Sequence, residues 1–130
     1  MILVTGATGH VGRTVVRHLA ALGCEVVALV RNAEAASRLL PPSSALRVAD
    51  YDDILAMKAA FAGIDEMVLV SSDGEARAVM RHHANVLEAA AAANIRHIVF
   101  TSIIDTDWQS PFYFAPVYRD AERRLAACGV

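Results

Sequence analysis

The sequence predicts an α/β fold, with a doubly wound parallel sheet of about five strands and helices on both faces. Three observations support this prediction. Short β-rich runs alternate with longer segments of helical period along all 130 residues. The runs Met67–Val70 and Ile98–Phe100 are apolar throughout, as expected of parallel strands covered on both faces. Alanine-rich stretches such as Ala89–Ala93 favour helices that pack closely against a sheet.

The predicted strands are short runs of β-branched and apolar residues, each followed by polar or turn-forming residues. In chain order they are Ile2–Thr5, Glu25–Val30, Leu46–Val48, Glu66–Ser71 and His97–Ser102. The predicted helices carry apolar residues at helical spacing between these strands. In chain order they are Val11–Leu22, Ala33–Leu40, Asp53–Phe61, about Glu75–Ala93, and Tyr118–Cys128. The alternation resumes unchanged after the prolines at 41 and 42, so we expect one domain over residues 1–130.

The composition excludes several classes of protein. With 55% hydrophobic and 20% charged residues and a mean hydropathy of +0.38, the chain is too apolar to be disordered, yet no apolar run approaches the ~20 residues that span a bilayer. A net charge of −2 and scattered arginines argue against a nucleic-acid partner. Two isolated cysteines and the lack of a basic leader predict a cytoplasmic protein. His82 and His83 have no partner at metal-ligand spacing, so no metal site is expected.

A glycine-rich turn gives the strongest functional signal. Gly6, Gly9 and Gly12 stand between a predicted strand and a predicted helix, which is the context of a dinucleotide-binding turn of the Rossmann type. The first glycine permits a sharp turn, the second lets the backbone approach a pyrophosphate, and the third lets the helix pack closely. An ordinary turn would not require three glycines. The expected cofactor contacts here are Gly6, Thr8, Gly9, His10, Val11 and Gly12.

The same turn does not fit a phosphate-binding loop of the nucleotide hydrolases. The interval from Gly6 to Gly12 is one residue too long for that motif, and Arg13 stands where the motif has lysine. The end of the second strand indicates which dinucleotide binds. Arg31 occupies the place where NAD enzymes usually have an acidic residue, and a guanidinium can bind a 2′-phosphate through two parallel hydrogen bonds. NADP(H) is therefore expected as the cofactor in preference to NAD(H). The alternative is that Arg31 is simply a solvated side chain at the end of a strand. Arg13, from the first helix, is a further candidate contact to the 2′-phosphate.

Polar residues follow the other strands at the edge where open α/β sheets bind ligands. Asp50 is predicted either to bind the adenine amine or to cap a helix. Further contacts to cofactor or substrate, as opposed to local capping, are expected from Ser71, Ser72, Thr101 and Ser102. His83 and Asn85 fall close to the apolar stripe of the long helix, where we expect buried polar groups with hydrogen-bond partners.

One long irregular segment, Asp105–Val117, is rich in aromatic residues. Segments of this kind are more often functional than idle. Its aromatic side chains either form walls for a flat apolar substrate or pack against the body of the domain, and the sequence leaves both readings open. They are Trp108, Phe112, Tyr113 and Phe114.

Taken together, these motifs resemble the NmrA-like branch of the atypical short-chain dehydrogenases/reductases, and within it the type 2 NAD(P)H:quinone oxidoreductases. The resemblance covers the whole chain and rests on Val4–Gly12, Val30–Asn32, Ala49–Tyr51, Asn85–Ala90 and Val99–Ser102. It implies NADPH bound across the glycine turn and Arg31, with hydride delivered to a quinone. A small-molecule acceptor is the implied partner, and the oligomeric state, a homodimer included, stays open.

The chain departs from this family in two respects. Candidate catalytic residues are Ser102 and Tyr118, but the usual Tyr-x-x-x-Lys pair is absent because Glu122 follows Tyr118 at the lysine position. A nearby negative charge disfavours an ionised phenol, whereas a quinone tolerates the loss because water can protonate the hydroquinone anion. Family members also run to about twice this length, so the chain is expected to be either a fragment or a natural short form. In both cases the part that supplies much of the substrate pocket in the family would be absent, and a sheet edge is expected to be exposed.

Two other functions remain open at this stage. Some NmrA-like proteins sense NADP(H) without catalysis and regulate a partner, and the absent lysine fits that function as well as it fits a quinone reductase. A sugar-nucleotide epimerase or dehydratase is the third alternative, and Arg31 and Glu122 argue against it.

Overall fold

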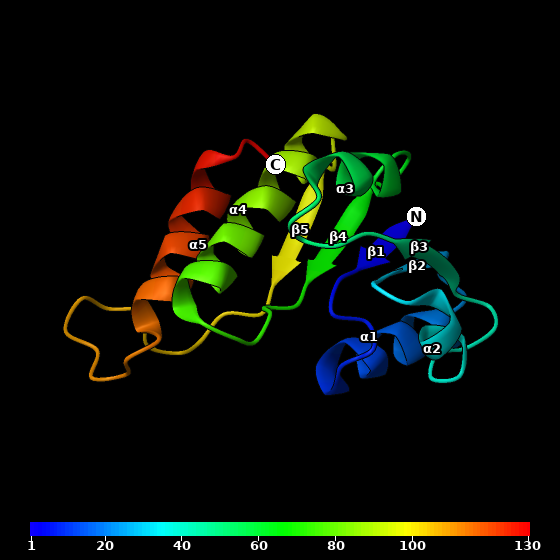
Figure 1. The fold of residues 1–130 in the computed structure, drawn as a ribbon, viewed down its shortest axis with the longest axis horizontal. Helices are drawn as coiled ribbons and strands as arrows, with labels where there is room; N and C mark the ends of the chain where they lie inside the picture. Colours follow the sequence, from blue (N-terminus) through cyan, green and yellow to red (C-terminus); the bar gives the residue numbers. More distant parts are fainter.

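The computed structural model describes all 130 residues and contains five strands and five helices in strict alternation. The strands form one sheet (Figure 1) and are β1 (Ile2–Val4), β2 (Val26–Val30), β3 (Ala45–Val48), β4 (Glu66–Leu69) and β5 (His97–Phe100). The helices are α1 (His10–Ala21), α2 (Ala33–Ser37), α3 (Ile54–Ala60), α4 (Ala76–Ala92) and α5 (Ala115–Ala127). None of the helices is both long and apolar enough to cross a membrane.

All neighbouring strands of the sheet run parallel, in the order β3-β2-β1-β4-β5. The central strand β1 pairs with β2 on one side, where Leu3 is opposite Val27, and with β4 on the other, where Leu3 is opposite Met67. The first three strands therefore extend the sheet from β1 to one edge at β3. The chain then crosses back over β1 and adds β4 and β5 on its other side. The point of reversal lies between the carboxyl ends of β1 and β4, where open α/β sheets bind ligands.

Alternate residues of each strand face two separate hydrophobic cores, as the period of two in a strand requires. On one face, strand residues such as Leu3 and Leu29 pack with α3, α4 and the fully buried Phe61. On the other face, Val4 and the remaining residues of β2 pack with α1 and α2. Figure 1 shows these two helical layers on opposite sides of the sheet. The doubly wound arrangement with helices on both faces is thereby confirmed.

The edge strand β5 is covered on only one face. Ile98 and Phe100 pack against the larger core, and α5 packs beside α4 over this half of the sheet. Val99, on the opposite face of β5, is 52% exposed because α1 and α2 lie over the other half of the sheet.

Two helix boundaries differ from the sequence prediction by three residues, and the others differ by no more than one. The last helix begins at Ala115, three residues before the predicted Tyr118, because Pro116 occupies its first turn. Proline has no amide hydrogen to lose at that position and its fixed φ suits a helix start, so it opens this helix where we had expected it to lie in a loop. The second helix ends at Ser37, three residues before the predicted Leu40.

Candidate functional site

The glycine turn between β1 and α1 disfavours side chains at two positions, through the backbone conformation at Gly6 and through lack of space at Gly12. Gly6 has a φ of +57°, in the left-handed region that favours glycine. A Cβ atom at Gly12 would lie 2.2 Å from the carbonyl oxygen of Gly6, so the first turn of α1 packs directly on the strand exit. A Cβ atom at Gly9 would lie 3.2 Å from the same oxygen. Two of the three glycines are therefore required by the fold itself.

Helix α1 begins at this turn with unpaired amide donors. The backbone N–H groups of His10, Val11 and Gly12 donate no hydrogen bond within the protein, and Gly9 at the N-cap has no side chain to accept one. Unpaired amides at a helix start, together with the positive end of the helix dipole, attract anions such as phosphate. The first intrahelical amide that is satisfied belongs to Arg13, which donates to the oxygen of Gly9 at 3.0 Å.

The turn is fastened to the end of β4, on the other side of the topological reversal. The buried hydroxyl of Thr5 accepts from the amide of Val70 at 2.9 Å and donates to the carbonyl of Val70 at 3.3 Å. Val70 also lies against Gly6, so the glycine turn is held directly beside the exit from β4. This places the unpaired amides of α1 at the ligand-binding position of an open α/β sheet.

Arg31 lies at the end of β2 beside two cavities near the turn. Its side chain is exposed and makes no hydrogen bond or ion pair within the protein. A small cavity of about 50 Å³ separates it from Thr8 and Tyr51, and a larger one of about 360 Å³ is lined by Arg31, Asp50, Tyr51, Asp52, Ser72, Asp73 and His82. An unpaired guanidinium at the rim of a polar cavity is available to an anionic ligand.

Asp50 also lines the larger cavity, and it does not cap a helix. Its carboxylate accepts from the amide of Asp52 at 2.9 Å and so stabilises the turn after β3. The N-cap of α3 is Asp53, which accepts from the amide of Ala56 at 2.9 Å. The capping alternative for Asp50 is therefore wrong, and its exposed carboxylate stays available to a ligand in the cavity.

Sequence reasoning missed Tyr51 as a site residue. Its hydroxyl accepts from the amide of Gly6 at 3.0 Å, and its carbonyl accepts from the side-chain amide of Asn85 at 2.9 Å. The ring of Tyr51 lies 5.4 Å from that of His82, and burial raises the pKa of its phenol. Tyr51 thus joins the glycine turn to the end of β3 and to α4. Its position directly after Asp50, at the end of a strand, was the available signal.

The ends of β4 and β5 are joined by side chains from the strands and from α4. The amide of Ser71 donates to the hydroxyl of Thr101 at 2.9 Å. The Ser71 hydroxyl lies 3.1 Å from Nε2 of His83, and the Ser72 hydroxyl lies 3.3 Å from Nδ1 of His82. For Asn85 the expected hydrogen bond is present, but the residue is half-buried and not buried. The expectation of a satisfied buried group is wrong for one nitrogen of His83, because the buried Nδ1 has no partner.

The two candidate catalytic residues are not arranged as a proton relay. The Ser102 hydroxyl donates to the carboxylate of Glu122, which also accepts from Thr106 at 3.0 Å. The half-buried Tyr118 lies between the rings of Phe100 and Phe114, and its hydroxyl makes no hydrogen bond. Glu122 thus holds Ser102 toward α5, and Tyr118 lies among aromatic rings without a polar partner.

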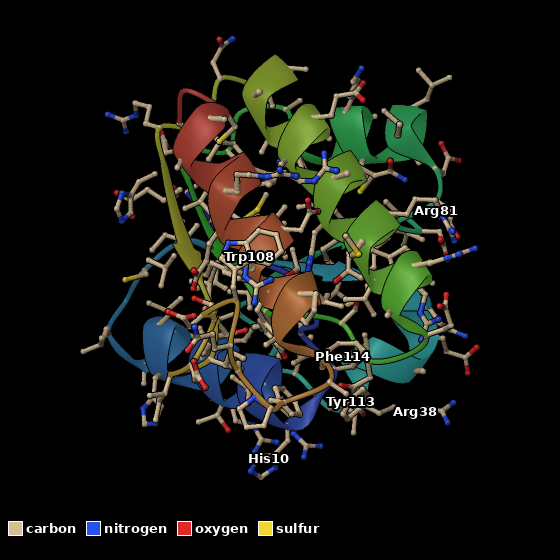
Figure 2. All side chains as sticks on the ribbon, turned by 90° about the vertical axis from the view of Figure 1, so that its left-hand side faces the viewer. His10, Arg38, Arg81, Trp108, Tyr113 and Phe114 are labelled. Atoms are coloured by element: carbon tan, nitrogen blue, oxygen red, sulfur yellow. The ribbon has the colours of Figure 1, made fainter.

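The aromatic segment lies at the same end of the molecule as the glycine turn. Figure 2 shows Phe114, Tyr113 and His10 successively nearer the carboxyl end of the sheet, with Trp108 nearer the middle of α5. Trp108 is 85% exposed and Tyr113 is 84% exposed, so packing against the body does not account for these two side chains. The guanidinium of Arg119 stacks on Trp108, 4.2 Å from the ring centre, and donates to the carbonyl of Thr106 at 2.7 Å.

Comparison with known families identifies the chain. A protein family described as NAD(P)H-binding matches residues 6–127, a span that includes the glycine turn and the carboxyl ends of β2, β3, β4 and β5. The chain belongs to this NAD(P)H-binding family. The matched span includes the unpaired amides at the start of α1.

Individual members of known function are similar to this NAD(P)H-binding chain. Quinone oxidoreductase 2 of Escherichia coli is 35% identical over 132 residues, which cover 100% of the chain and 46% of the relative. An NAD(P)H azoreductase of Xenophilus azovorans is 32% identical over 111 residues, covering 85% of the chain and 38% of the relative. The chain spans about half the length, or less, of these relatives.

A solved structure shows the same likeness in three dimensions. The triphenylmethane reductase of Citrobacter sp., crystallised with NADP(H), superposes with a TM-score of 0.93 at 31% identity, over 100% of this chain and 46% of the reductase. The resemblance to NmrA-like reductases of the quinone oxidoreductase type is confirmed by these comparisons.

Proposed function

We propose that this chain is the nucleotide-binding half of an NADPH-dependent reductase that transfers hydride to a quinone or a similar flat, conjugated acceptor. One observation carries the proposal. The three unpaired amides at the start of α1 and the unpaired guanidinium of Arg31 lie on one edge of the sheet, around the crevice where an open α/β sheet binds its ligand.

Each residue of this edge has a role that fits its chemistry. The amides of His10, Val11 and Gly12 would hold the pyrophosphate, and Arg31 would bind the 2′-phosphate that distinguishes NADPH from NADH. Asp50 would accept from the adenine amine in the cavity that it lines. Ser71, Ser72 and Thr101 would contact the part of the cofactor that crosses the ends of β4 and β5. Bound NADPH supplies the hydride.

The chemistry of the acceptor follows from what Ser102 and Tyr118 do. Ser102 donates to Glu122, and no lysine stands beside Tyr118 to assist its ionisation. A carbonyl that must be protonated as it is reduced is poorly served by this arrangement. A quinone yields a stabilised hydroquinone anion that water can protonate. The names of the relatives agree with this choice, since quinones, azo compounds and triphenylmethane dyes are all conjugated acceptors.

The aromatic segment would supply a wall for such an acceptor. Tyr113 is exposed at the carboxyl end of the sheet, where the hydride donor of the cofactor would lie. Phe112, which contacts Tyr113, and Trp108, nearer the middle of α5, are exposed as well. The rings of Phe112, Tyr113 and Phe114 form successive edge contacts with centres 5.3 and 5.6 Å apart. Flat ligands stack on such rings, which favour offset and edge-on contacts over exact superposition.

The proposal is tested by the oxidation of NADPH in the presence of a panel of acceptors, namely a quinone, an azo dye and a simple ketone. We expect oxidation that requires the quinone or the dye, and little with the ketone. The variant Tyr118→Phe should keep the rate within about threefold, because general acid catalysis contributes a factor of about 10²–10⁴ where it operates. Tight NADPH binding without turnover of any acceptor would contradict the reductase and favour a non-catalytic NADP(H) sensor.

A further inference from the structure

His83 is a buried histidine that the proposed reduction does not use. It lies on the inner face of α4 with 2% of its surface exposed, and its ring meets the ring of Phe100 edge-on at 5.4 Å. Nε2 lies 3.1 Å from the hydroxyl of Ser71, at the end of β4. Nδ1 is buried and has no hydrogen-bond partner. The two ring nitrogens therefore stand in unequal surroundings.

The unequal surroundings determine where the imidazole carries its proton. Burial, reinforced by the neighbouring His82, lowers the pKa of His83 to about 4, so the ring is neutral and holds one proton at physiological pH. A proton on Nδ1 would leave a buried N–H donor with no acceptor, which native proteins rarely tolerate. A proton on Nε2 is donated to Ser71, and Nδ1 is then only an acceptor whose lone pair has no donor. The structure thus favours the Nε2–H tautomer.

This tautomer determines which way the Ser71 hydroxyl points. Its oxygen receives the N–H of His83, so its own hydrogen must seek another acceptor. The acceptor that the protein offers is the carbonyl of Ser72 at 3.5 Å, which is longer than an effective O–H···O bond. The backbone amide of Ser71 is already used by Thr101. The hydroxyl hydrogen is therefore left without a close acceptor within the protein.

We propose that His83 is a positioning residue that holds the Ser71 hydroxyl as a hydrogen-bond donor to an oxygen of the bound dinucleotide. This inference rests on the proposed function. Ser71 follows Val70, which lies against Gly6 of the glycine turn, so a dinucleotide held by the amides of α1 passes the hydroxyl of Ser71. The chemical class of the acceptor is a phosphate or ribose oxygen of its central part.

The first test is a double-mutant cycle on NADPH affinity, measured by calorimetry. We expect Ser71→Ala to weaken NADPH binding about tenfold and His83→Leu to weaken it by the same factor. The double variant should bind as either single variant does, because His83 acts through the Ser71 hydroxyl. His83→Gln should bind within about threefold of the unmodified protein, since its amide nitrogen can donate to Ser71 as Nε2 does. Circular dichroism confirms that each variant is folded.

Three outcomes would overturn the assignment. Unchanged NADPH affinity of Ser71→Ala would show that the Ser71 hydroxyl does not contact the cofactor. If the double variant bound NADPH more weakly than Ser71→Ala by the full factor that His83→Leu causes alone, the two effects would be independent. His83 would then act on the fold and not through the Ser71 hydroxyl. Failure of the unmodified protein to bind NADPH would overturn the proposed function as well.

A second measurement does not depend on a variant or on a ligand. Nitrogen-15 NMR of the imidazole distinguishes the two tautomers of a neutral histidine. We expect Nε2 of His83 to carry the hydrogen in the unmodified protein at neutral pH. A hydrogen on Nδ1 would contradict the direction of the bond to Ser71 and, with it, the positioning role.

Discussion

Tyr51 shows how one residue can fasten three separate segments. Its hydroxyl accepts from Gly6, its ring lies beside His82, and its carbonyl accepts from Asn85. The glycine turn needs such an anchor because glycines make few side-chain contacts and lose much conformational entropy on folding. An acceptor at Gly6 also satisfies an amide that would otherwise be unpaired at the strand exit.

The substitution Tyr51→Phe removes this acceptor and keeps the ring. We expect the free energy of unfolding to fall by about 1 kcal/mol and NADPH binding to weaken several-fold, because the amide of Gly6 loses its partner. Urea unfolding and calorimetry measure the two effects. Tyr113→Phe is the matched control, since the side chain of Tyr113 is exposed and its hydroxyl makes no hydrogen bond. Equal effects of the two substitutions would contradict the anchoring role.

His83 gives the stability of the fold a dependence on pH with a definite sign. Its pKa is about 4 in the folded protein against an ordinary value of 6.5. Between these two pH values the unfolded chain binds a proton that the folded chain does not, so stability falls as pH drops from 6.5 toward 4. A shift of this size corresponds to about 3 kcal/mol. Above pH 6.5 the residue contributes no pH dependence.

The variant His83→Gln does not titrate and isolates this contribution. Between pH 7 and pH 4, the free energy of unfolding should fall in both proteins. The fall should be about 3 kcal/mol smaller in His83→Gln than in the unmodified protein. Urea denaturation at several pH values measures the difference. Parallel profiles for His83→Gln and the unmodified protein would show that His83 is not buried in its neutral form.

At the scale of elements, the contact between β1 and α1 depends on two glycines for different reasons. At Gly12 an added methyl group would collide with the backbone of Gly6 at 2.2 Å, whereas at Gly9 the nearest atom is 3.2 Å away. Gly12→Ala should therefore lower the free energy of unfolding by about 3 kcal/mol and abolish NADPH binding.

Gly9→Ala is the informative partner to this substitution. It should lower stability by less than about 1 kcal/mol, yet weaken NADPH binding tenfold or more, because its methyl group would occupy the approach of the pyrophosphate to the backbone. Thermal unfolding and calorimetry on both variants separate the packing role from the binding role. Equal losses of stability would contradict the distinction between the two glycines.

The elements were predictable from the sequence to within a few residues, and the contacts between them were not. Apolar period and the glycine spacing indicate the order of strands and helices and the position of the turn, because both signals are local. The bonds from Gly6 to Tyr51 and from Ser71 to His83 join residues 45 and 12 positions apart, which no local pattern reports. The predicted start of α5 is three residues late because Pro116, which is expected in a loop, lies in the first turn of the helix.

At the scale of the whole molecule, the two faces of the sheet are unequally protected. The core under α3 and α4 includes the fully buried Phe61, whereas Val99 on the opposite face of β5 is 52% exposed. Phe61→Ala should cost about 3–5 kcal/mol of stability and Val99→Ala less than about 1 kcal/mol. Urea unfolding of both variants measures this difference. A large loss for Val99→Ala would show that β5 is covered on both faces.

The central claim is that the edge of the sheet around the glycine turn and Arg31 binds NADPH in preference to NADH. Calorimetric titration of the unmodified protein and of Arg31→Ala with both nucleotides tests it most directly. We expect NADPH to bind at least about tenfold more tightly than NADH, and Arg31→Ala to lose that margin of about 1.4 kcal/mol while its affinity for NADH is unchanged. Equal affinity for the two nucleotides, or a preference that survives in Arg31→Ala, would contradict the claim.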